Sequence, residues 1–144
     1  MDKLFQAFSG TPYNKTRSIF EEYFHEQQQD KREVYLFFLN DRIIGYGTLV
    51  WNSPYPRFSE HQIPEIKDLN IIVEYRRHGY GTHLIKHMEE RARERGHLIL
   101  GIGAGLTPDY EAARRLYPSL GYISDGNGVH QTQWGDVIYF NKRL

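Results

Sequence analysis

The chain of 144 residues contains no cysteine. This absence excludes disulfide bonds, thiolate metal sites and a cysteine nucleophile. No apolar run approaches the roughly 18 residues that a membrane-spanning helix needs. The first residues, Met1 to Gly10, also lack the basic and then apolar layout of a secretion signal. We therefore expect a cytoplasmic protein that does not engage a membrane.

A net charge is also lacking, because 18 Lys and Arg balance 18 Asp and Glu. Proteins that bind duplex nucleic acid usually carry a basic excess on one face, so nucleic acid is not an expected partner. The sequence shows no internal repeat, and the proline-containing stretch 52–64 is too short to separate domains. We expect one domain over residues 1–144, a length that buries a sizeable core.

Hydrophobic periodicity predicts alternating helices and strands. Apolar residues at helical spacing indicate helices over 14–29, 83–95 and 107–120. Thr107 and Pro108 supply a start for the last of these, and Gly96 and Gly121 supply stops. Apolar, β-branched runs indicate strands over 34–39, 43–51, 63–73, 98–105, 122–123 and 136–140. This order predicts an α/β protein with a mixed, mostly antiparallel sheet flanked by helices.

The segment Arg76-Arg77-His78-Gly79-Tyr80-Gly81-Thr82 joins a predicted strand to an amphipathic helix. Its glycines permit close approach of a ligand to the backbone, and the free N–H groups of the following helical turn favour an anion. A diphosphate would fit there, although a tight turn that serves only geometry explains the glycines equally well. The segment lacks the third glycine of a dinucleotide fingerprint and the Gly-Lys-Ser/Thr of a P-loop.

Two motifs resemble those of the GNAT acetyltransferase superfamily. Arg76-x-x-Gly79-x-Gly81, preceded by Leu69-x-Ile71 and Glu74-Tyr75, resembles its pyrophosphate-binding motif. Ala113-x-x-Leu116-Tyr117-x-x-x-Gly121-Tyr122 resembles its second motif, a helix that ends in glycine and an aromatic residue. The resemblance implies the single-domain GNAT fold and acetyl-CoA as co-substrate of an N-acetyltransferase, with no metal.

The resemblance also implies a path for the co-substrate. The pyrophosphate would lie on the loop of Arg76, Arg77, His78, Gly79, Tyr80, Gly81 and Thr82, and the pantetheine arm would follow Leu69, Asn70 and Ile71, where the strands separate. Asp109 and Tyr110 stand where the family often has a pantetheine-contacting asparagine, and Tyr117 would also contact the cofactor. Gly101, Gly103 and Gly105 would bare one strand face for this path or permit tight packing.

Acetyl transfer to an amine requires a base, since an alkylamine is protonated at neutral pH. By position in the motif, Glu65 is the expected base and Asp68 the second choice. Tyr117 is the expected acid for the departing thiolate, although it could simply be a core residue. A backbone N–H at Leu69 would polarise the thioester carbonyl. Without cysteine, direct attack in a ternary complex is the simplest route.

Some alternatives stay open. The domain could bind acyl-CoA without catalysis, as a sensor, or use the same loop as a phosphate-binding regulator. His83 and His87 are spaced to share a metal, but a solvated pair is the expected reading. Trp51, Tyr55, Phe58 and Trp134 could line a pocket or belong to the core.

The expected acceptor is the primary amine of a small cationic molecule. Between Ser18 and Asp30 the chain carries Glu21, Glu22, Glu26 and Asp30 and no Lys or Arg. Such acids on one helix flank would attract a cation if this helix borders the acceptor site, as the resemblance implies. A solvated acidic face is the competing interpretation, and a homodimer is left open.

Overall fold

A computed structural model describes residues 17–144, which form helices and strands in nearly the predicted order. The first helix, α2 (Arg17–Gln28), agrees with the prediction, and residues 14–16 and Met1 to Gly10 lie outside the described residues. The other helices are α3 (Pro56–Ser59), α4 (Tyr80–Glu94) and α5 (Glu111–Ser119), with short 3-10 turns η1 (Val73–Tyr75) and η2 (Pro108–Tyr110). The strands are β1 (Arg32–Leu39), β2 (Arg42–Val50), β3 (Glu65–Ile71), β4 (Ile99–Gly105), β5 (Ile123–Ser124), β6 (His130–Thr132) and β7 (Gly135–Arg143).

The strands of the described chain form one sheet in the order β1-β2-β3-β4-β7-β5, with β6 pairing with β7. The β3–β4 pair is parallel and the others are antiparallel, which confirms the mixed, mostly antiparallel sheet. Among the α-helices and strands, two elements were not predicted. Strand β6 forms a hairpin with β7, and Pro56 starts the short helix α3 inside the expected loop 52–64.

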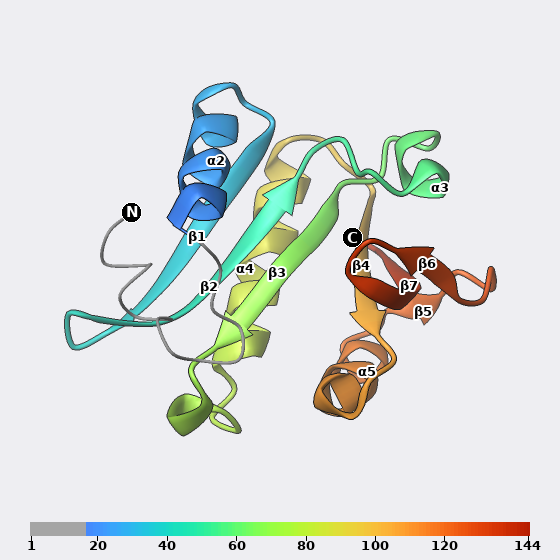
Figure 1. Ribbon diagram of the computed structural model, residues 1–144. Helices are drawn as coiled ribbons and strands as arrows, with labels where there is room; N and C mark the ends of the chain where they lie inside the picture. The colour runs from blue at the N-terminus through green and yellow to red at the C-terminus, as the bar shows by residue number, and fades with distance from the viewer. Residues whose placement is uncertain (1–16) are drawn as a thin grey trace.

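The sheet separates two apolar clusters, so each face has its own helices. On one face, here called the α2 face, Phe20 and Tyr23 of α2 pack with Tyr46 and Ile72. On the other, the α4 face, the predicted stripe of α4 packs with residues of β2, β3, β4, α5 and β7 and with Tyr122, which follows α5. The cluster includes Leu49, Ile66, Leu84, Ile85, Met88, Ala92, Leu100, Ile102, Tyr117, Tyr122 and Phe140. Figure 1 shows α2 and α4 on opposite sides of β1 to β3.

The predicted stops of α4 and α5 are confirmed. Gly96 (φ 83°) and Gly121 (φ 96°) take left-handed conformations. At the end of α5, the N–H of Tyr122 donates to the carbonyl of Tyr117 at 3.1 Å, a closing bond typical of such helix ends. Pro118 lies inside the last turn of α5, and the helix still reaches Ser119, so Tyr117 keeps helical geometry.

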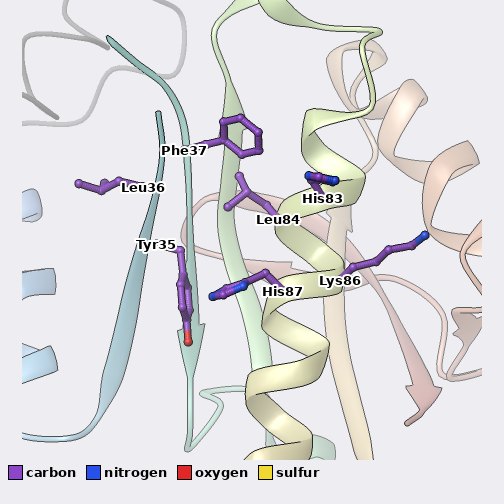
Figure 2. Close-up of a pocket in the computed structure, with 7 residues that line it drawn as sticks. All are labelled: Tyr35, Leu36, Phe37, His83, Leu84, Lys86 and His87. Carbon is purple, nitrogen blue, oxygen red and sulfur yellow. The ribbon is translucent and has the colours of Figure 1, made fainter. Parts of the chain in front are cut away.

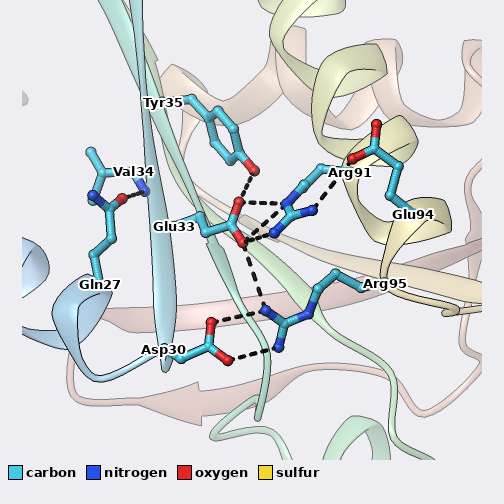
Figure 3. Close-up of polar contacts among 8 residues, drawn as sticks. All are labelled: Gln27, Asp30, Glu33, Val34, Tyr35, Arg91, Glu94 and Arg95. Carbon is cyan, nitrogen blue, oxygen red and sulfur yellow. Dashed lines mark hydrogen bonds and ion pairs between the residues drawn. The ribbon is translucent and has the colours of Figure 1, made fainter.

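A cluster of ion pairs fastens the C-terminal half of α4 to the β1 edge of the sheet (Figure 3). Nε of Arg91 lies 2.8 Å from Oε1 of Glu33, which also accepts the hydroxyl of Tyr35 at 2.5 Å. The guanidinium of Arg95 makes two bonds, of 2.8 and 3.1 Å, to the carboxylate of Asp30. These ion pairs tie the C-terminal end of α4 to β1 and to the turn that precedes it.

Within residues 17–144, no helix combines the length and apolar character required to cross a membrane.

Candidate active site

Strands β3 and β4 share only two residue pairs, Glu65 with Gly101 and Ile66 with Ile102. Beyond these pairs, β3 continues alongside β2 as far as Ile71, and β4 alongside β7 as far as Gly105. Figure 1 shows the two strands separating toward the ends that lead into α4 and α5. The facing backbone edges are therefore unpaired with each other, at the place where the sequence predicts that the strands separate.

A β-bulge lies in β3 next to this divergence. Gly47 of β2 lies between Tyr46, which pairs with Asn70, and Thr48, which pairs with Lys67, so Asp68 and Leu69 together oppose one residue. Asp68 has φ 60°, a left-handed conformation that is unusual for a residue other than glycine. Bulges re-aim backbone groups near active sites. The bulge thus sets the direction of the backbone at Leu69, the expected donor to a thioester carbonyl.

The first turn of α4 begins beside the divergence and is open to a ligand. Gly79 precedes the helix with φ 82°. Gly81 lies inside the first turn, its φ is not positive, and among residues 17–144 a Cβ placed on it would meet only Ile71, at 3.9 Å. The fold therefore does not require glycine at 81. An uncovered backbone beside free helical N–H groups is what an anion at this terminus needs.

The side chains of the loop make separate local contacts. Nε of Arg76 donates to the carbonyl of Ile71 at 2.9 Å, so this guanidinium reaches back to the end of β3. His78 stacks on Tyr80 with ring centroids 5.7 Å apart. Arg77 is exposed, with φ 65°. The backbone of the turn, more than a cluster of cationic side chains, makes the candidate phosphate site.

Glu65 begins β3 and faces the α2 side of the sheet. Its side chain is buried, at 4% exposure, and accepts a 2.6 Å hydrogen bond from Oγ of Ser53. Burial raises the pKa of the Glu65 carboxyl, while Lys67 and the Ser53 hydroxyl act to lower it. A carboxyl with a raised pKa is the kind of group that accepts a proton near neutral pH.

Asp68, the second candidate base, is engaged by other residues. Its carboxylate accepts the hydroxyl of Tyr23 at 2.7 Å, and a guanidinium nitrogen of Arg32 lies 3.5 Å away. Arg32 is itself buried and donates to Thr48 at 2.6 Å. This network links α2 to the bulge and occupies the carboxylate of Asp68.

Tyr117 lies in α5 on the opposite face of the sheet from Glu65. It is 6% exposed and packs in the α4-face cluster near Tyr122 and Phe140. Among the described residues we find no hydrogen-bond partner for its hydroxyl. Burial, and next the phenol of Tyr110, raise the pKa of Tyr117, so this phenol keeps its proton at neutral pH. The structure thus places the expected acid and the expected base on opposite faces of the sheet.

Aromatic rings cover the glycine face of β4. A Cβ on Gly101 would lie 2.3 Å from the ring of Phe58, and one on Gly105 would lie 2.7 Å from the ring of Tyr110. Side chains of β7 cover Gly103 in the same way. The glycines therefore permit tight packing of side chains against this face of β4. Tyr110 precedes α5, while the carboxylate of Asp109 bonds locally to the hydroxyl of Thr107.

The acids of the first helix do not form a free acidic wall. Asp30 lies beyond the end of α2 at Gln28, so the expected shared flank is wrong at that residue. The carboxylate of Glu26 is 2.7 Å from Nε of Arg32, and Asp30 pairs with Arg95. The acids differ from the expected free flank because the chain turns after Gln28, and because Arg32 of β1 and Arg95 at the end of α4 pair with them.

A shallow hollow lies on the other flank of α4, against β1. It encloses about 490 Å³ and is lined by residues of β1 and α4 (Tyr35, Leu36, Phe37, His83, Leu84, Lys86 and His87). In Figure 2, His87 points toward Tyr35, and their ring centroids are 5.1 Å apart. His83 and His87 are exposed, and no cluster of three or more potential metal ligands occurs within residues 17–144.

The aromatic residues considered for a pocket lie in separate places. Tyr55 and Phe58 belong to a small core with Tyr139, whereas Trp51 stacks on His97. Trp134, 75% exposed, lies between β6 and β7. Ser53, Tyr23 and Arg32, which contact the candidate bases, were not predicted, and no local sequence signal distinguishes them.

Comparison with known proteins agrees with this fold. The model of the acetyltransferase (GNAT) family matches residues 1–122. A ribosomal-protein-alanine N-acetyltransferase from Brucella melitensis superimposes with a TM-score of 0.71 at 21% identity, covering 99% of this chain and 91% of that one. A GNAT family acetyltransferase from Elizabethkingia anophelis with acetyl-CoA bound gives 0.65 at 20% identity, covering 94% of each chain.

An aminoglycoside 6'-N-acetyltransferase complexed with coenzyme A gives a TM-score of 0.72 at 19% identity, covering 99% of this chain and 89% of that one. At these identities the neighbours show the fold. No curated protein matches the sequence. Because the family model spans most of the chain and the strands and helices follow the GNAT fold, this chain belongs to the GNAT acetyltransferase family, the acetyl-CoA-dependent N-acetyltransferases.

Proposed function

We propose that residues 1–144 form one catalytic domain that transfers the acetyl group of acetyl-CoA to the primary amine of a small cationic molecule. The single observation that carries this proposal is the divergence of β3 and β4, with Glu65 on one face of the sheet and Tyr117 on the other. A thioester lying in the divergence would have a base on the side of α2 and an acid on the side of α5.

The co-substrate site fits the residues that surround the divergence. The pyrophosphate would lie on the first turn of α4, where Gly81 leaves the backbone uncovered. The pantetheine arm would pair with the unpaired edge of β3 from Leu69 to Ile71. Tyr110 would border the arm, in place of the amide that the family often has.

The proposed reaction is a direct attack in a ternary complex. The amine nitrogen forms a bond to the thioester carbonyl carbon while Glu65 takes the amine proton. The carbonyl oxygen gains charge and receives the N–H of Leu69, held by the bulge at Asp68. As the carbon–sulfur bond breaks, Tyr117 gives its proton to the thiolate. Glu65 is preferred to Asp68 as base, because Asp68 is already bound by Tyr23 and lies beside Arg32.

The acceptor would approach over the α2 face. Its positive charge would be met by Glu65 and by Asp125. Burial acts to raise the pKa of Asp125, but hydrogen bonds from Tyr55 and Asn127 together lower it below its usual value. Glu22 is the acid of α2 that would add to this field, because Glu26 and Asp30 are paired with arginines. The aminoglycoside 6'-N-acetyltransferase among the fold neighbours is consistent with a small-molecule amine as acceptor.

The test combines binding and turnover. Calorimetry with acetyl-CoA comes first, followed by thiol release with polyamines, aminoglycosides, amino acids, peptides and neutral amines at low and high salt. Turnover with a cationic amine that weakens at high salt supports the proposal. Equal turnover of neutral and cationic amines would reject the preference for a cationic acceptor. Rates unchanged in both Glu65→Gln and Tyr117→Phe would reject the assigned acid and base.

A further inference from the structure

Ser53 is a buried hydroxyl whose surroundings fix the direction of its proton. The side chain is 3% exposed. Its Oγ accepts the backbone N–H of Tyr55 at 3.0 Å and lies 2.6 Å from Oε1 of Glu65. Because a hydroxyl has a single proton and the N–H of Tyr55 already points at the oxygen, that proton is directed at the carboxylate.

Glu65 has few other groups to orient it. Among residues 17–144, Ser53 is the residue found hydrogen-bonded to its side chain. The charged groups that act on the pKa of Glu65 are Lys67 of the same strand, Asp68 in the bulge and Arg32 of β1. In turn, the charge of Glu65 contributes to the raised pKa of the Tyr139 phenol in β7. These groups act through space and do not set the rotation of the carboxylate.

The geometry points to Ser53 as a positioning residue for the base of the acetyl transfer. Its hydroxyl holds the Glu65 carboxylate in one orientation and favours the ionised form that accepts the amine proton. This inference rests on the proposed role of Glu65. Ser53 itself forms and breaks no covalent bond in the reaction.

A second serine of the same segment provides a matched control. Oγ of Ser59 donates to the carbonyl of Pro56 at 3.1 Å, and Ser59 is half-buried. Ser59→Ala therefore removes a hydroxyl from the segment around α3 and leaves Glu65 untouched. Ser53→Thr keeps a hydroxyl at the site, whereas Ser53→Ala removes it.

The experiment measures Glu65 directly and through turnover. The carboxyl carbon of Glu65 is titrated by NMR in the free enzyme, with Glu65→Gln to assign its signal, and kcat/KM is measured from acidic to basic pH. In Ser53→Ala the NMR midpoint should move to higher pH. At neutral pH kcat/KM should fall about tenfold, the effect of one hydrogen bond to a charged group, and recover as the pH rises. Ser53→Thr should restore both readouts in part, and Ser59→Ala should change neither.

The outcomes separate this inference from the proposed function. An unchanged Glu65 midpoint in Ser53→Ala overturns the positioning role. A raised midpoint with an unchanged rate profile overturns Glu65 as the base instead, and leaves Ser53 only as its partner. If Ser53→Ala does not fold, Ser53→Cys, whose thiol is a weak donor, takes its place with the same readouts.

Discussion

The hydroxyl of Tyr23 in α2 donates a 2.7 Å hydrogen bond to the carboxylate of Asp68 in the bulge of β3. The two residues are 45 positions apart, and this bond joins the helix on one face of the sheet to the strand that borders the proposed thioester site. Asp68 is held at φ 60°, a conformation that needs support from its surroundings. The phenol of Tyr23 is part of that support.

Replacing Tyr23 by phenylalanine should lower both stability and turnover. The lost bond to a charged group should cost about 1.5–3 kcal/mol of unfolding free energy. Because the bulge then loses one restraint, kcat should fall while the affinity for acetyl-CoA stays near that of the wild type. Denaturant unfolding, steady-state kinetics and calorimetry measure the three quantities.

Tyr35→Phe is the control for this variant. Its hydroxyl bonds to Glu33 at 2.5 Å, so the variant also loses a phenol–carboxylate bond, but on the edge strand β1. It should lose stability and retain kcat. If Tyr23→Phe retains kcat equally well, the link from α2 to the bulge has no catalytic consequence.

Replacing Gly81 by glutamate should separate binding from folding. The backbone there accepts a side chain, and an acid in the first turn of a helix stabilises it by about 0.3–1 kcal/mol, so the protein should stay folded. The same acid should repel a pyrophosphate and weaken acetyl-CoA binding by at least about tenfold. Calorimetry checks the affinity, and Gly81→Ala, which adds only a methyl group, should bind far better than Gly81→Glu. Equal affinity in Gly81→Glu and the wild type would place the pyrophosphate elsewhere.

Tyr117→Phe should reduce turnover without loss of stability. Its hydroxyl has no hydrogen-bond partner among residues 17–144, so its removal leaves no broken bond in the folded state. Lost proton transfer should lower kcat by roughly 10²- to 10⁴-fold. Tyr122→Phe provides the contrast, because that hydroxyl donates to the buried Glu89 at 2.9 Å, and its loss should cost about 1–3 kcal/mol. Wild-type kcat in Tyr117→Phe would show that the residue only packs.

Glu65→Gln should inactivate the enzyme and stabilise it at neutral pH. The folded-state pKa of Glu65 is raised by burial above its unfolded value, so the carboxyl favours folding when protonated and loses that contribution as pH rises through the folded-state pKa. Glutamine does not ionise. The melting temperature of Glu65→Gln should therefore match the wild type in acid and exceed it increasingly as the pH rises. A lower melting temperature across the neutral range would contradict a desolvated Glu65.

The sequence predicts those parts of the site that depend on local pattern. The stripe of α4 and its stop at Gly96 follow from helical spacing and turn chemistry, and the structure has them where expected. The helix begins earlier than predicted, at Tyr80, so the last residues of the expected glycine loop form its first turn. The same reasoning misses Ser53, which lies in a segment without periodicity and meets Glu65 only because β2 and β3 pair in a particular register.

The arginine partners of the acids are missed for a similar reason. Asp30 has the spacing of a helical residue, but α2 ends at Gln28, and Arg95 reaches it from α4, 65 positions away. Likewise, β6 has no alternating apolar pattern, and it is a strand because its backbone pairs with β7. Contacts of this kind depend on where the elements dock, which no short window of sequence specifies.

The divergence of β3 and β4 also bears on how the protein holds together. Two residue pairs join β3 to β4, so the sheet has few backbone hydrogen bonds between its two halves. A pantetheine arm carries amide groups of its own, and in the divergence it would act as a short borrowed strand between the two edges. Binding of the co-substrate would then stabilise the C-terminal half of the sheet, and the stability of that half would in turn contribute to co-substrate affinity. A substitution that destabilises the C-terminal half of the sheet would therefore weaken acetyl-CoA binding, even where it lies far from the co-substrate.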